Sequence, residues 1–568
     1  MWEKRRIHCH TVEDVIRENI WDRFHEKLED YLTPKEAPYL KNLKEAVEFM
    51  KHTAEEGKIL NIVADYDADG ITSGTILTLL QWYLGGKTHT VFPKRMSEGY
   101  GFSEKILNRL VEGNIITIDN GIAAANPISK ATQMGYECFV IDHHLKRDDG
   151  ILPNCPILDP HIENESTFTD FCAAGLAWSC MREALGENRN ESEEFLLEYA
   201  TILASIATVT DVVPLHGANR QLLKDGMVLF QKEHMPIGLR LLKQKMDITV
   251  VGEDDYGFKI GPVFNAAGRM EDDGPSIVFR LLTTDDEVEA EQISELLLSI
   301  NEERKQQVAE EVRLAKEMLG DERPNSIVLA SKDFHQGTVG IVSGKLTEEY
   351  GVPSVVFAIT ADGLLHGSGR SVSDINLKGL MDKVHGEIPN IFLGYGGHAG
   401  AIGVTIHPNT QNILWEKMNE LLPKREKSDV SFYDLEIRPE EVEEVLAELD
   451  EFRPFGEGNP MPIFLIKDVT CGLMRDGNHY RILGNQGEHV KTKMPLGDGD
   501  LPFNLFFLRD NYEKEEFPQN FDCLANLSYN YFRSDEGKPE VMVQAFQKKE
   551  EPKTELYQSL ASLLDFSL

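Results

Sequence analysis

From about residue 58 the chain alternates between short apolar runs and amphipathic stretches. The apolar runs have the length of β-strands, and the amphipathic stretches repeat apolar residues at helical spacing. We predict strands at Ile59–Ala64, His89–Phe92, Ile115–Ile118 and Cys138–Ile141, and helices near residues 71–84, 103–112 and 122–134. This alternation predicts an α/β fold whose mostly parallel sheet is covered by helices on both faces.

A long amphipathic stretch follows residue 284. Thr284 and Glu287 form a capping-box pattern, which indicates the start of a helix. Apolar residues then recur at helical spacing from Ile293 to Leu319, over a length that would span about 50 Å at about 1.5 Å per residue. We interpret residues 284–320 as a helix that connects two lobes, the second of which is the alternating segment 321–424.

The pattern changes toward both ends of the chain. Residues 1–50 are charged and helical in periodicity, and they predict an N-terminal helical cap. Residues 430–548 are richer in short strand candidates, and residues 549–568 combine a charged run with an amphipathic pattern, which we interpret as a C-terminal tail. The strand candidates of the C-terminal region are Pro462–Ile466, Tyr480–Leu483, Phe503–Leu508 and Val541–Ala545.

Composition fits a multidomain protein of a reducing compartment. The chain has 568 residues, of which 41% are hydrophobic and 27% are charged, and three or four domains are expected at this length. Its seven cysteines include no Cys-x-x-Cys pair, which argues against a disulfide framework or a zinc ribbon. No signal-peptide core and no run of 18 apolar residues is present, so we expect a cytoplasmic protein without a membrane segment.

The formal net charge of −37 restricts the partners that the surface can bind. A strongly acidic surface repels nucleic acid, so the net charge argues against a broad nucleic-acid-coating surface. Any polyanionic substrate must therefore be held by a local basic patch or by metal ions. This requirement directs attention to clusters of acids, histidines and arginines.

The first such cluster is KILNIVADYDADG, residues 58–70. A predicted strand ends in Asp65, Asp67 and Asp69, and Gly70 and a predicted helix follow. Three carboxylates so close together repel one another unless a cation compensates them. Hard divalent ions prefer oxygen ligands, so this stretch predicts half of a metal site, although a polar loop after a strand would look the same.

Two further predicted strands end in similar residues. Asp119 follows Ile115–Ile118, and Asp142, His143 and His144 follow Cys138–Ile141. The carboxyl ends of parallel strands meet at one edge of a sheet, where ligands bind. A further acid, Asp211, follows the apolar segment 200–209. Together these residues favour a metal centre over a purely structural arrangement.

Taken in order, these motifs resemble a known superfamily. DYDADG, DNG, DHH and TDVV are similar to the four signature motifs of the DHH phosphoesterases, and LGYGGHAGAIG resembles the glycine-rich motif of the DHHA1 domain. NAAGRM, FHQGTVGIVSGKL, GSGRS and RPFGEGNPMPIF resemble the RecJ family of single-strand-specific exonucleases. The chain departs from that family in Gly369, where alanine is frequent, and in its strong acidity.

The resemblance implies a domain order for nearly the whole chain. It implies a DHH catalytic domain at residues 51–283, a DHHA1 domain at 321–424 and an OB-type nucleic-acid-binding β-barrel at 430–548. It also implies cleavage of single-stranded DNA from the 5′ end in repair or recombination. A single-strand-binding protein is the implied partner, and we expect a monomer.

The set of acids and histidines suits hydrolysis of a phosphodiester by two metal ions. A single imidazole among oxygen ligands favours Mn²⁺ over Mg²⁺. From the superfamily pattern, Asp119 would bridge the ions, Asp67 would bind the first, and Asp69, His143 and Asp211 would bind the second. Asp65 would ligate an ion or orient water. His144 would contact the scissile phosphate or make a hydrogen bond behind the ligands, and Asp142 would orient an imidazole or cap the turn.

Substrate phosphate needs donors from the protein as well. The planar fork of arginine binds phosphate oxygens bidentately. Arg95, Arg269 and Arg370 lie near glycine or serine residues that permit close approach, although arginines of this kind can equally be solvated surface groups. The resemblance assigns them, together with Ser371 and His398, to binding of phosphate or DNA. For His398 a tight structural turn is the alternative.

Three other functions fit part of the pattern. A small-substrate phosphoesterase that cleaves oligonucleotides or pyrophosphate would use the same metal motifs, but the extra C-terminal domain argues against it. A non-catalytic nucleic-acid-binding scaffold would have lost some of the motif acids, and all are present. A tRNA-editing role rests only on the Gly-Gly-His motif, residues 396–398.

Overall fold

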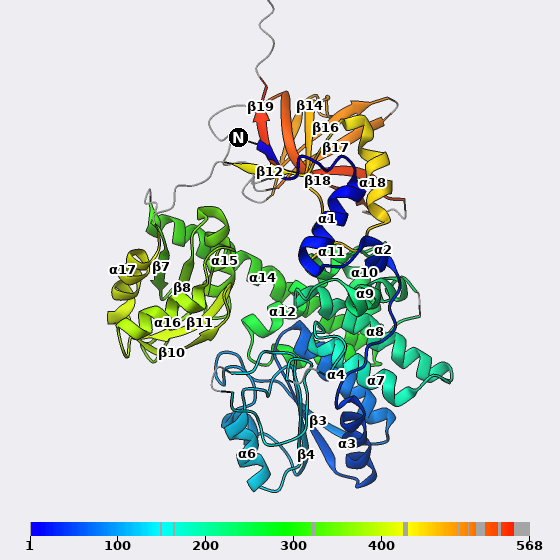
Figure 1. Cartoon of the computed structure of the whole chain (residues 1–568), viewed down its shortest axis with the longest axis vertical. Helices are drawn as coiled ribbons and strands as arrows, with labels where there is room; N and C mark the ends of the chain where they lie inside the picture. Colours follow the sequence, from blue (N-terminus) through cyan, green and yellow to red (C-terminus); the bar gives the residue numbers. More distant parts are fainter. Residues whose placement is uncertain are drawn as a thin grey trace, which may run out of the picture.

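The structure is a computed structural model, and it describes most of the chain (Figure 1). The described ranges are 2–147, 150–162, 165–232, 234–320, 324–423, 430–484, 489–497, 499–506, 517–531 and 536–549. The predicted C-terminal tail lies outside them, except for Lys549. Two α/β lobes are joined by one long helix, and a β-rich domain follows, so the fold class predicted from the sequence is confirmed.

The first lobe contains a five-stranded parallel sheet of order β3-β2-β4-β5-β6. The strands are β2 (Ile59–Ala64), β3 (Lys87–Val91), β4 (Gly113–Ile118), β5 (Cys138–Ile141) and β6 (Ile157–Leu158). Apolar residues of β2, β4 and β5 pack on both faces, against helices α3, α4 and α7 on one side and α5 and α6 on the other. These helices are α3 (Leu43–Glu55), α4 (Ala68–Tyr83), α5 (Glu104–Leu107), α6 (Ala125–Gln133) and α7 (Ala173–Leu185).

One predicted helix of this lobe is much shorter than expected. The pattern predicted a helix near residues 103–112, but α5 ends at Leu107. The buried side chain of Asn61 accepts a hydrogen bond from the Val111 amide at 3.0 Å and donates one to the Val111 carbonyl at 2.9 Å. A side chain from the neighbouring strand thus satisfies backbone groups that a longer helix would have paired internally.

The rest of the first lobe is helical, and the apolar segment 200–209 lies inside a helix. The helices are α8 (Glu191–Thr210), α9 (Gly217–Phe230), α10 (Ile237–Lys245), α11 (Glu253–Asp255), η1 (Tyr256–Ile260), α12 (Gly261–Met270) and α13 (Gly274–Thr283). They share one apolar core with the sheet. Asp211 is the C-terminal cap of α8. Among the described residues, no helix is both long and apolar enough to cross a membrane.

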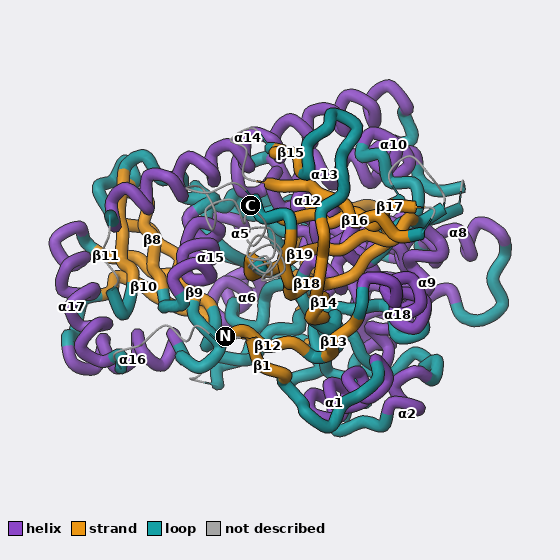
Figure 2. The backbone as a smooth tube through the Cα atoms, turned by 90° about the horizontal axis from the view of Figure 1, so that it is seen from above, coloured by secondary structure: helices purple, strands orange, loops and turns teal. Residues whose placement is uncertain are grey.

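The connecting helix is α14 (Glu287–Leu319), with 33 residues. Figure 2 shows it as one uninterrupted helix from the second lobe to α10 and α13. Its cap is Asp286, whose carboxylate accepts hydrogen bonds from the amides of Val288 and Glu289. The predicted Thr284–Glu287 capping box is therefore wrong, because Asp286 reaches the first amides of the helix while Thr284 hydrogen-bonds to Glu289.

The second lobe has a mixed five-stranded sheet of order β10-β11-β9-β8-β7. The strands are β7 (Ile327–Ser331), β8 (Ser354–Ile359), β9 (Leu365–Arg370), β10 (Phe392–Gly397) and β11 (Ala401–Ile406). Helix α15 (Val339–Tyr350) covers one face of this sheet, while α16 (Leu377–Glu387) and α17 (Gln411–Leu421) cover the other. A short turn, η2 (Pro408–Thr410), precedes α17.

The C-terminal domain has a seven-stranded sheet of order β13-β14-β18-β19-β17-β16-β15. Its elements are β13 (Leu435–Ile437), η3 (Pro439–Glu441), α18 (Val442–Asp450), β14 (Phe464–Thr470), β15 (Tyr480–Leu483), β16 (His489–Leu496), β17 (Gly499–Leu505), β18 (Asn520–Asn530) and β19 (Lys538–Lys548). The domain also includes the start of the chain. β1 (Trp2–Lys4) pairs in parallel with β12 (Ser431–Tyr433), and α1 (Val12–Phe24) and α2 (Leu28–Leu32) share the core of the domain.

Candidate metal centre

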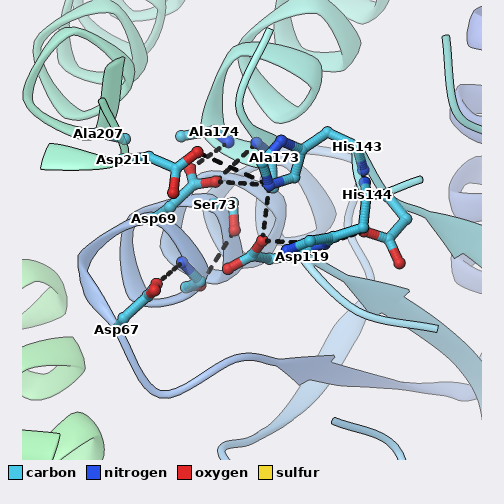
Figure 3. Close-up of polar contacts among 12 residues, drawn as sticks. Asp67, Asp69, Ser73, Asp119, His143, His144, Ala173, Ala174, Ala207 and Asp211 are labelled. Carbon is cyan, nitrogen blue, oxygen red and sulfur yellow. Dashed lines mark hydrogen bonds and ion pairs between the residues drawn. The ribbon is translucent and has the colours of Figure 1, made fainter. Parts of the chain in front are cut away.

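The predicted acids and histidines of the first lobe meet at the carboxyl edge of the sheet (Figure 3). Asp65 directly follows β2, Asp119 directly follows β4, and Asp142, His143 and His144 follow β5. These three strands are neighbours in the order β2-β4-β5. The parallel topology therefore brings together groups that lie up to 79 positions apart in the sequence.

Two glycines allow the chain to turn sharply at this edge. A Cβ on Gly70 would lie 2.4 Å from the backbone oxygen of Asp65, so α4 can start against the end of β2 only with glycine there. Asp67 caps the helix by accepting a hydrogen bond from the Gly70 amide at 3.1 Å. Gly121 has a φ of 119°, and a Cβ there would lie 2.2 Å from Thr117 Oγ1.

The imidazole of His143 is the centre of one group of ligand atoms. Its Nε2 atom lies 3.1 Å from Asp119 Oδ1, 3.7 Å from Asp69 Oδ2 and 3.8 Å from Asp211 Oδ2. Asp119 also belongs to a second group, because ligand atoms of Asp65, Asp67 and Asp119 lie within 4.8 Å of one another. Ligand atoms of Asp119, His143 and His144 lie equally close to one another, so Asp119 is near both the Asp65–Asp67 pair and the histidines.

The buried carboxylates at this edge repel one another and need positive charge to compensate them. Burial and the neighbouring carboxylates raise the pKa of Asp65 and of Asp119 well above the usual value, and raise the pKa of Asp69 to about 7. Asp65 Oδ1 is buried and has no hydrogen-bond partner among the described residues. Divalent cations bound to these oxygens would give Asp65 Oδ1 a partner and would favour the ionised form of the carboxylates. The residues therefore fit a metal site.

The protonation state of His143 also suits a metal ligand. Burial and the adjacent charge of His144 lower the pKa of His143 to about 3. The imidazole is therefore neutral near pH 7, which is the form that coordinates metals. With oxygen ligands around one nitrogen, the donor set suits Mn²⁺ or Mg²⁺.

Two helix ends hold the carboxylates of the His143 group. The amides of Ala173 and Ala174, at the start of α7, donate hydrogen bonds of 2.7 Å to the two carboxylate oxygens of Asp69. Asp211 is held as the last cap of α8, with its amide donating to the Ala207 carbonyl at 2.8 Å. The positive end of α7 stabilises negative charge on Asp69, and neither support was visible in the sequence pattern.

Asp142 holds His144 rather than joining the ligand groups. Its Oδ1 atom lies 2.8 Å from His144 Nδ1, and its Oδ2 atom accepts a hydrogen bond from the Ile122 amide at 2.9 Å. Burial opposes the charge of His144, but the hydrogen bond and charge of Asp142 outweigh it and raise the pKa of His144 to about 9. His144 thus carries a proton near neutral pH, beside the two ligand groups.

Tyr100 is a residue of this site that the sequence reasoning did not single out. Its hydroxyl donates a hydrogen bond to the Asp119 carbonyl at 3.2 Å and lies 3.5 Å from His144 Nε2. The side chain is 54% exposed, so a substrate can reach it. A signal was present in the sequence, since Tyr100 stands between two glycines, Gly99 and Gly101, that both have positive φ.

The three predicted arginines gather at one place between the lobes. Burial and the positive charges of Arg95 and Arg370 lower the pKa of Arg269 to about 10. The guanidinium of Arg95 lies over the ring of Tyr66, 5.0 Å from its centroid, and Arg370 donates to Ser368 Oγ at 2.9 Å. Within the described ranges none of the three pairs with a carboxylate, so their charge is available to an anion.

Helix α15 begins beside these arginines. A Cβ on Gly340 would lie 3.2 Å from Arg370 Nη2, and one on Gly337 would lie 1.9 Å from the Arg269 carbonyl oxygen. Backbone of the second lobe therefore packs directly on α12, where the NAAGRM motif lies. The positive end of α15 adds to the positive potential of the arginines.

Ser371 and His398 lie together at the end of β9 and in the turn between β10 and β11. The Ser371 amide donates to the Gly400 carbonyl at 3.0 Å, and its hydroxyl donates to the Ile375 carbonyl at 2.8 Å. The Gly400 amide donates to His398 Nδ1 at 3.3 Å. Both side chains take part in local turns, and among the described residues neither contacts the ligand groups.

Family models match three parts of the chain. The N-terminal domain of the DHH family matches residues 59–205, the DHHA1 domain matches 324–424, and the RecJ OB domain matches 433–545. These matches follow the order of the two lobes and the β-rich domain.

Curated relatives and a solved structure agree with these models. The chain is 30% identical over 482 residues to the single-stranded-DNA-specific exonuclease RecJ of Bacillus subtilis, covering 82% of this chain but only 58% of the relative. It is 29% identical over 522 residues to the Escherichia coli exonuclease of that name, covering 86% and 87% of the two chains. The crystal structure of RecJ from Thermus thermophilus in complex with Mn²⁺ superposes with a TM-score of 0.74 at 25% identity, over 94% of this chain and 76% of that one.

Proposed function

We propose that the chain, which is similar to RecJ exonucleases over most of its length, is a RecJ-like DHH phosphoesterase that acts as a metal-dependent exonuclease for single-stranded DNA. One observation carries the proposal. His143 Nε2 lies within 3.8 Å of three carboxylates, and one of them, Asp119, is shared with a second group of carboxylates. Two adjoining ligand groups suit the hydrolysis of a phosphodiester by two ions.

We assign the ligands by this division. Asp65 and Asp67 would hold one ion, Asp69, His143 and Asp211 would hold the other, and Asp119 would contribute to both. Mn²⁺ is favoured over Mg²⁺ because one ligand is an imidazole. When bound, the ions supply electrostatic stabilisation of the reacting phosphate and an activated water.

The side chains around the metal centre position the substrate. His144, charged and held by Asp142, donates a hydrogen bond from Nε2 to an oxygen of the scissile phosphate. Before substrate binds, the Tyr100 hydroxyl lies near His144 Nε2. When substrate binds, a phosphate oxygen replaces this hydroxyl as the partner of Nε2. Because Asp142 fixes the ring at Nδ1, the donor at Nε2 is oriented before the strand arrives.

The arginine group explains the direction in which the strand is digested. A terminal 5′ phosphate carries more charge than an internal diester, and Arg95, Arg269 and Arg370 offer a positive cluster without carboxylate partners among the described residues. We infer that this cluster, with Ser371 and His398 nearby on the second lobe, binds the 5′ end, so that digestion runs from 5′ to 3′. Beyond this site, the OB-type domain binds the strand that has not yet been cleaved.

The biological setting follows from the family alone. We expect a role in DNA repair or recombination, a monomer in the cytoplasm, and contact with a single-strand-binding protein. The domain divisions at residues 51–283, 284–320, 321–424 and 430–548 remain predictions of the same kind.

Digestion of end-labelled single strands tests the proposal. With Mn²⁺ present, a 5′ label is expected to appear at once in mononucleotides, while a 3′ label stays in a strand that shortens gradually. Early release of the 3′ label would contradict the direction. Faster turnover of a dinucleotide than of a long strand would instead identify a small-substrate phosphoesterase, and no turnover of either would favour the non-catalytic scaffold.

A further inference from the structure

The loop between α8 and α9, residues 211–216, starts at Asp211 and ends at His216. His216 Nε2 lies 2.6 Å from Asp170 Oδ2. Asp170 in turn lies three residues before Ala173, whose amide holds Asp69. The His216–Asp170 pair therefore joins two backbone segments. One of them supports Asp69 and the other carries Asp211, and both carboxylates belong to the His143 group.

A second hydrogen-bonding residue joins the same two segments. Asn219, which is fully buried, donates from Nδ2 to the Asp170 carbonyl at 2.5 Å and to the Pro214 carbonyl at 3.1 Å. The ring of His216 is also stacked on Phe24, with centroids 4.4 Å apart, and lies 5.3 Å from the ring of Phe168. The rings of Phe24 and Phe168 thus pack against the imidazole and restrict its orientation.

The C-terminal domain contacts the α8–α9 loop, and Figure 1 shows its helices α1 and α2 near α9. The Leu215 amide donates to the Glu457 carbonyl at 2.8 Å, and the Tyr31 hydroxyl donates to the Leu215 carbonyl at 2.7 Å. A Cβ on Gly456 would lie 2.6 Å from Leu215 Cδ1. The N-terminal helices and the RPFGEGN segment therefore fix both backbone groups of Leu215.

The loop needs these restraints, because its backbone is strained. Val212, directly after Asp211, has a φ of 57° and a side chain that is 64% exposed. A β-branched residue is unfavourable in this left-handed conformation and keeps it only where the surroundings impose it. Exposure leaves Val212 without packing of its own, so the contacts at Leu215 and His216 supply the restraint.

We propose that His216 is a positioning residue of the metal centre. Through Asp170 it sets the separation of Asp69 and Asp211, and through Phe24 it links that separation to the N-terminal helices. The inference rests on the proposed function only in that the His143 group binds a divalent ion. Residues behind metal ligands typically change metal affinity by about 10- to 100-fold when they are replaced.

Mn²⁺ titration of the full chain, without DNA, tests the inference. His216→Phe keeps an aromatic ring beside Phe24 and Phe168 but removes the nitrogen that contacts Asp170, so we expect Mn²⁺ to bind about tenfold more weakly. His216→Gln places an amide nitrogen near the same point and should recover most of the affinity. Asp170→Asn, which barely changes the shape of the side chain, should weaken binding in the same direction.

Thr201→Val is the matched control. Thr201 Oγ1 accepts a hydrogen bond from Trp178 Nε1 at 3.0 Å, which ties α7 to α8 away from the ligands. This variant should lower the unfolding temperature without changing the affinity for Mn²⁺. Parent-like binding by His216→Phe and Asp170→Asn, or an equal loss in Thr201→Val, would overturn the inference. A parent chain that binds Mn²⁺ but does not cleave DNA would contradict the proposed function and leave the positioning role supported or overturned by the same titration.

Discussion

The carboxylate of Asp119 lies 3.1 Å from His143 Nε2 and also forms a group with Asp65 and Asp67. Its backbone has a φ of 61°, a conformation that asparagine and aspartate tolerate better than other residues with a side chain. Burial and four neighbouring carboxylates raise its pKa well above the usual value. As the proposed bridging ligand, Asp119 would serve the metal centre at the expense of the stability of the metal-free fold.

Asp119→Asn should separate these two effects. Asparagine keeps the shape and the left-handed backbone but removes the charge that the ions share, so we expect turnover to fall at least about 1,000-fold, or about 4 kcal/mol in barrier. In EDTA near pH 8 the variant should unfold at a higher temperature than the parent, because a buried repulsive charge is gone. Activity within tenfold of the parent would contradict the bridging assignment.

Arg370 tests the recognition of the strand end. A single arginine that makes two charge-assisted hydrogen bonds to a terminal phosphate contributes about 3 kcal/mol, or roughly a hundredfold. Arg370→Ala should therefore lower kcat/KM for 5′-phosphorylated strands by about that factor more than for 5′-hydroxyl strands. Arg313→Ala, which breaks an exposed pair with Glu317 on α14, is the control and should leave the ratio unchanged. An equal loss on both substrates would place Arg370 elsewhere along the strand.

The burial of Asp159 predicts that the free energy of unfolding depends on pH. The residue follows β6, is 6% exposed, and has one oxygen without a hydrogen-bond partner among the described residues. Burial raises the pKa of Asp159 to about 7, whereas the pKa of an aspartate in an unfolded chain is about 4. The folded state holds the proton more tightly, so ionisation destabilises the fold increasingly as the pH rises from about 4 to about 7.

Asp159→Asn should remove this penalty. The gain in unfolding free energy should be larger at pH 8 than at pH 5, by up to about 3 kcal/mol. Urea unfolding at the two pH values measures the difference, and Asp247→Asn, at an exposed position, should show none. A gain that does not change with pH would mean that Asp159 is not protonated in the folded state.

At the scale of elements, α14 and α15 determine where the second lobe lies. Glu311 of α14 is 2% exposed and accepts hydrogen bonds of 2.6 Å from the His335 amide and from Thr338 Oγ1. These groups form the start of α15, which lies against Arg269 and Arg370. One buried carboxylate thus connects the long helix to the segment that completes the arginine cluster.

Glu311→Ala should destabilise the chain and weaken strand binding together. Removing the carboxylate takes away the shared acceptor of the His335 amide and the Thr338 hydroxyl, at a cost of about 2–4 kcal/mol. Glu311→Gln retains one acceptor and should cost less, and Glu310→Ala, an exposed neighbour, should cost almost nothing. Thermal unfolding and binding of a 5′-phosphorylated strand measure the two effects. Loss of stability with unchanged binding would show that Glu311 does not position the arginine cluster.

The elements that the sequence predicted best are those determined by their own residues. β2 and β5 have the predicted ends, because each is a buried apolar run that stops at a charged residue. Short-range pattern failed where a side chain distant in sequence determined the structure. The predicted helix 103–112 ends early because Asn61 hydrogen-bonds to the backbone of Val111. The pattern also failed at Thr284, where two plausible caps stand close together and Asp286 has the better geometry.

The candidate site shows the same limit. The acids and histidines were identifiable because the topology places the ends of parallel strands together, whatever the details of packing. Their supports were not identifiable, since the amides of Ala173 and Ala174 carry no sequence signal. The RPFGEGN segment was recognised only as a family motif, whereas the structure explains its Gly456 by contact with Leu215.

At the scale of the whole molecule, the net charge of −37 contrasts with the three arginines between the lobes. Long-range repulsion keeps nucleic acid away from most of the surface. Under the proposed function, affinity must then come from a few local contacts with phosphates.

This contrast predicts a weak dependence of binding on salt. With about three phosphates neutralised, the logarithm of the binding constant for a single strand should fall with the logarithm of salt concentration at a slope of about −2. Fluorescence anisotropy in EDTA, where no cleavage occurs, provides the measurement. A slope steeper than about −4 would reveal an extended basic path that the net charge conceals.

The pairing of β1 with β12 has a consequence for how the chain is made. Residues 2–4 leave the ribosome about 20–90 s before their partners at residues 431–433 at usual rates of translation. During that interval the apolar side of α1, with Val12, Ile16 and Ile20, has no core to enter. Both lobes can be synthesised before the domain that encloses this helix, so the nascent chain exposes an apolar helix to which a chaperone can bind until residues 430–548 have been made.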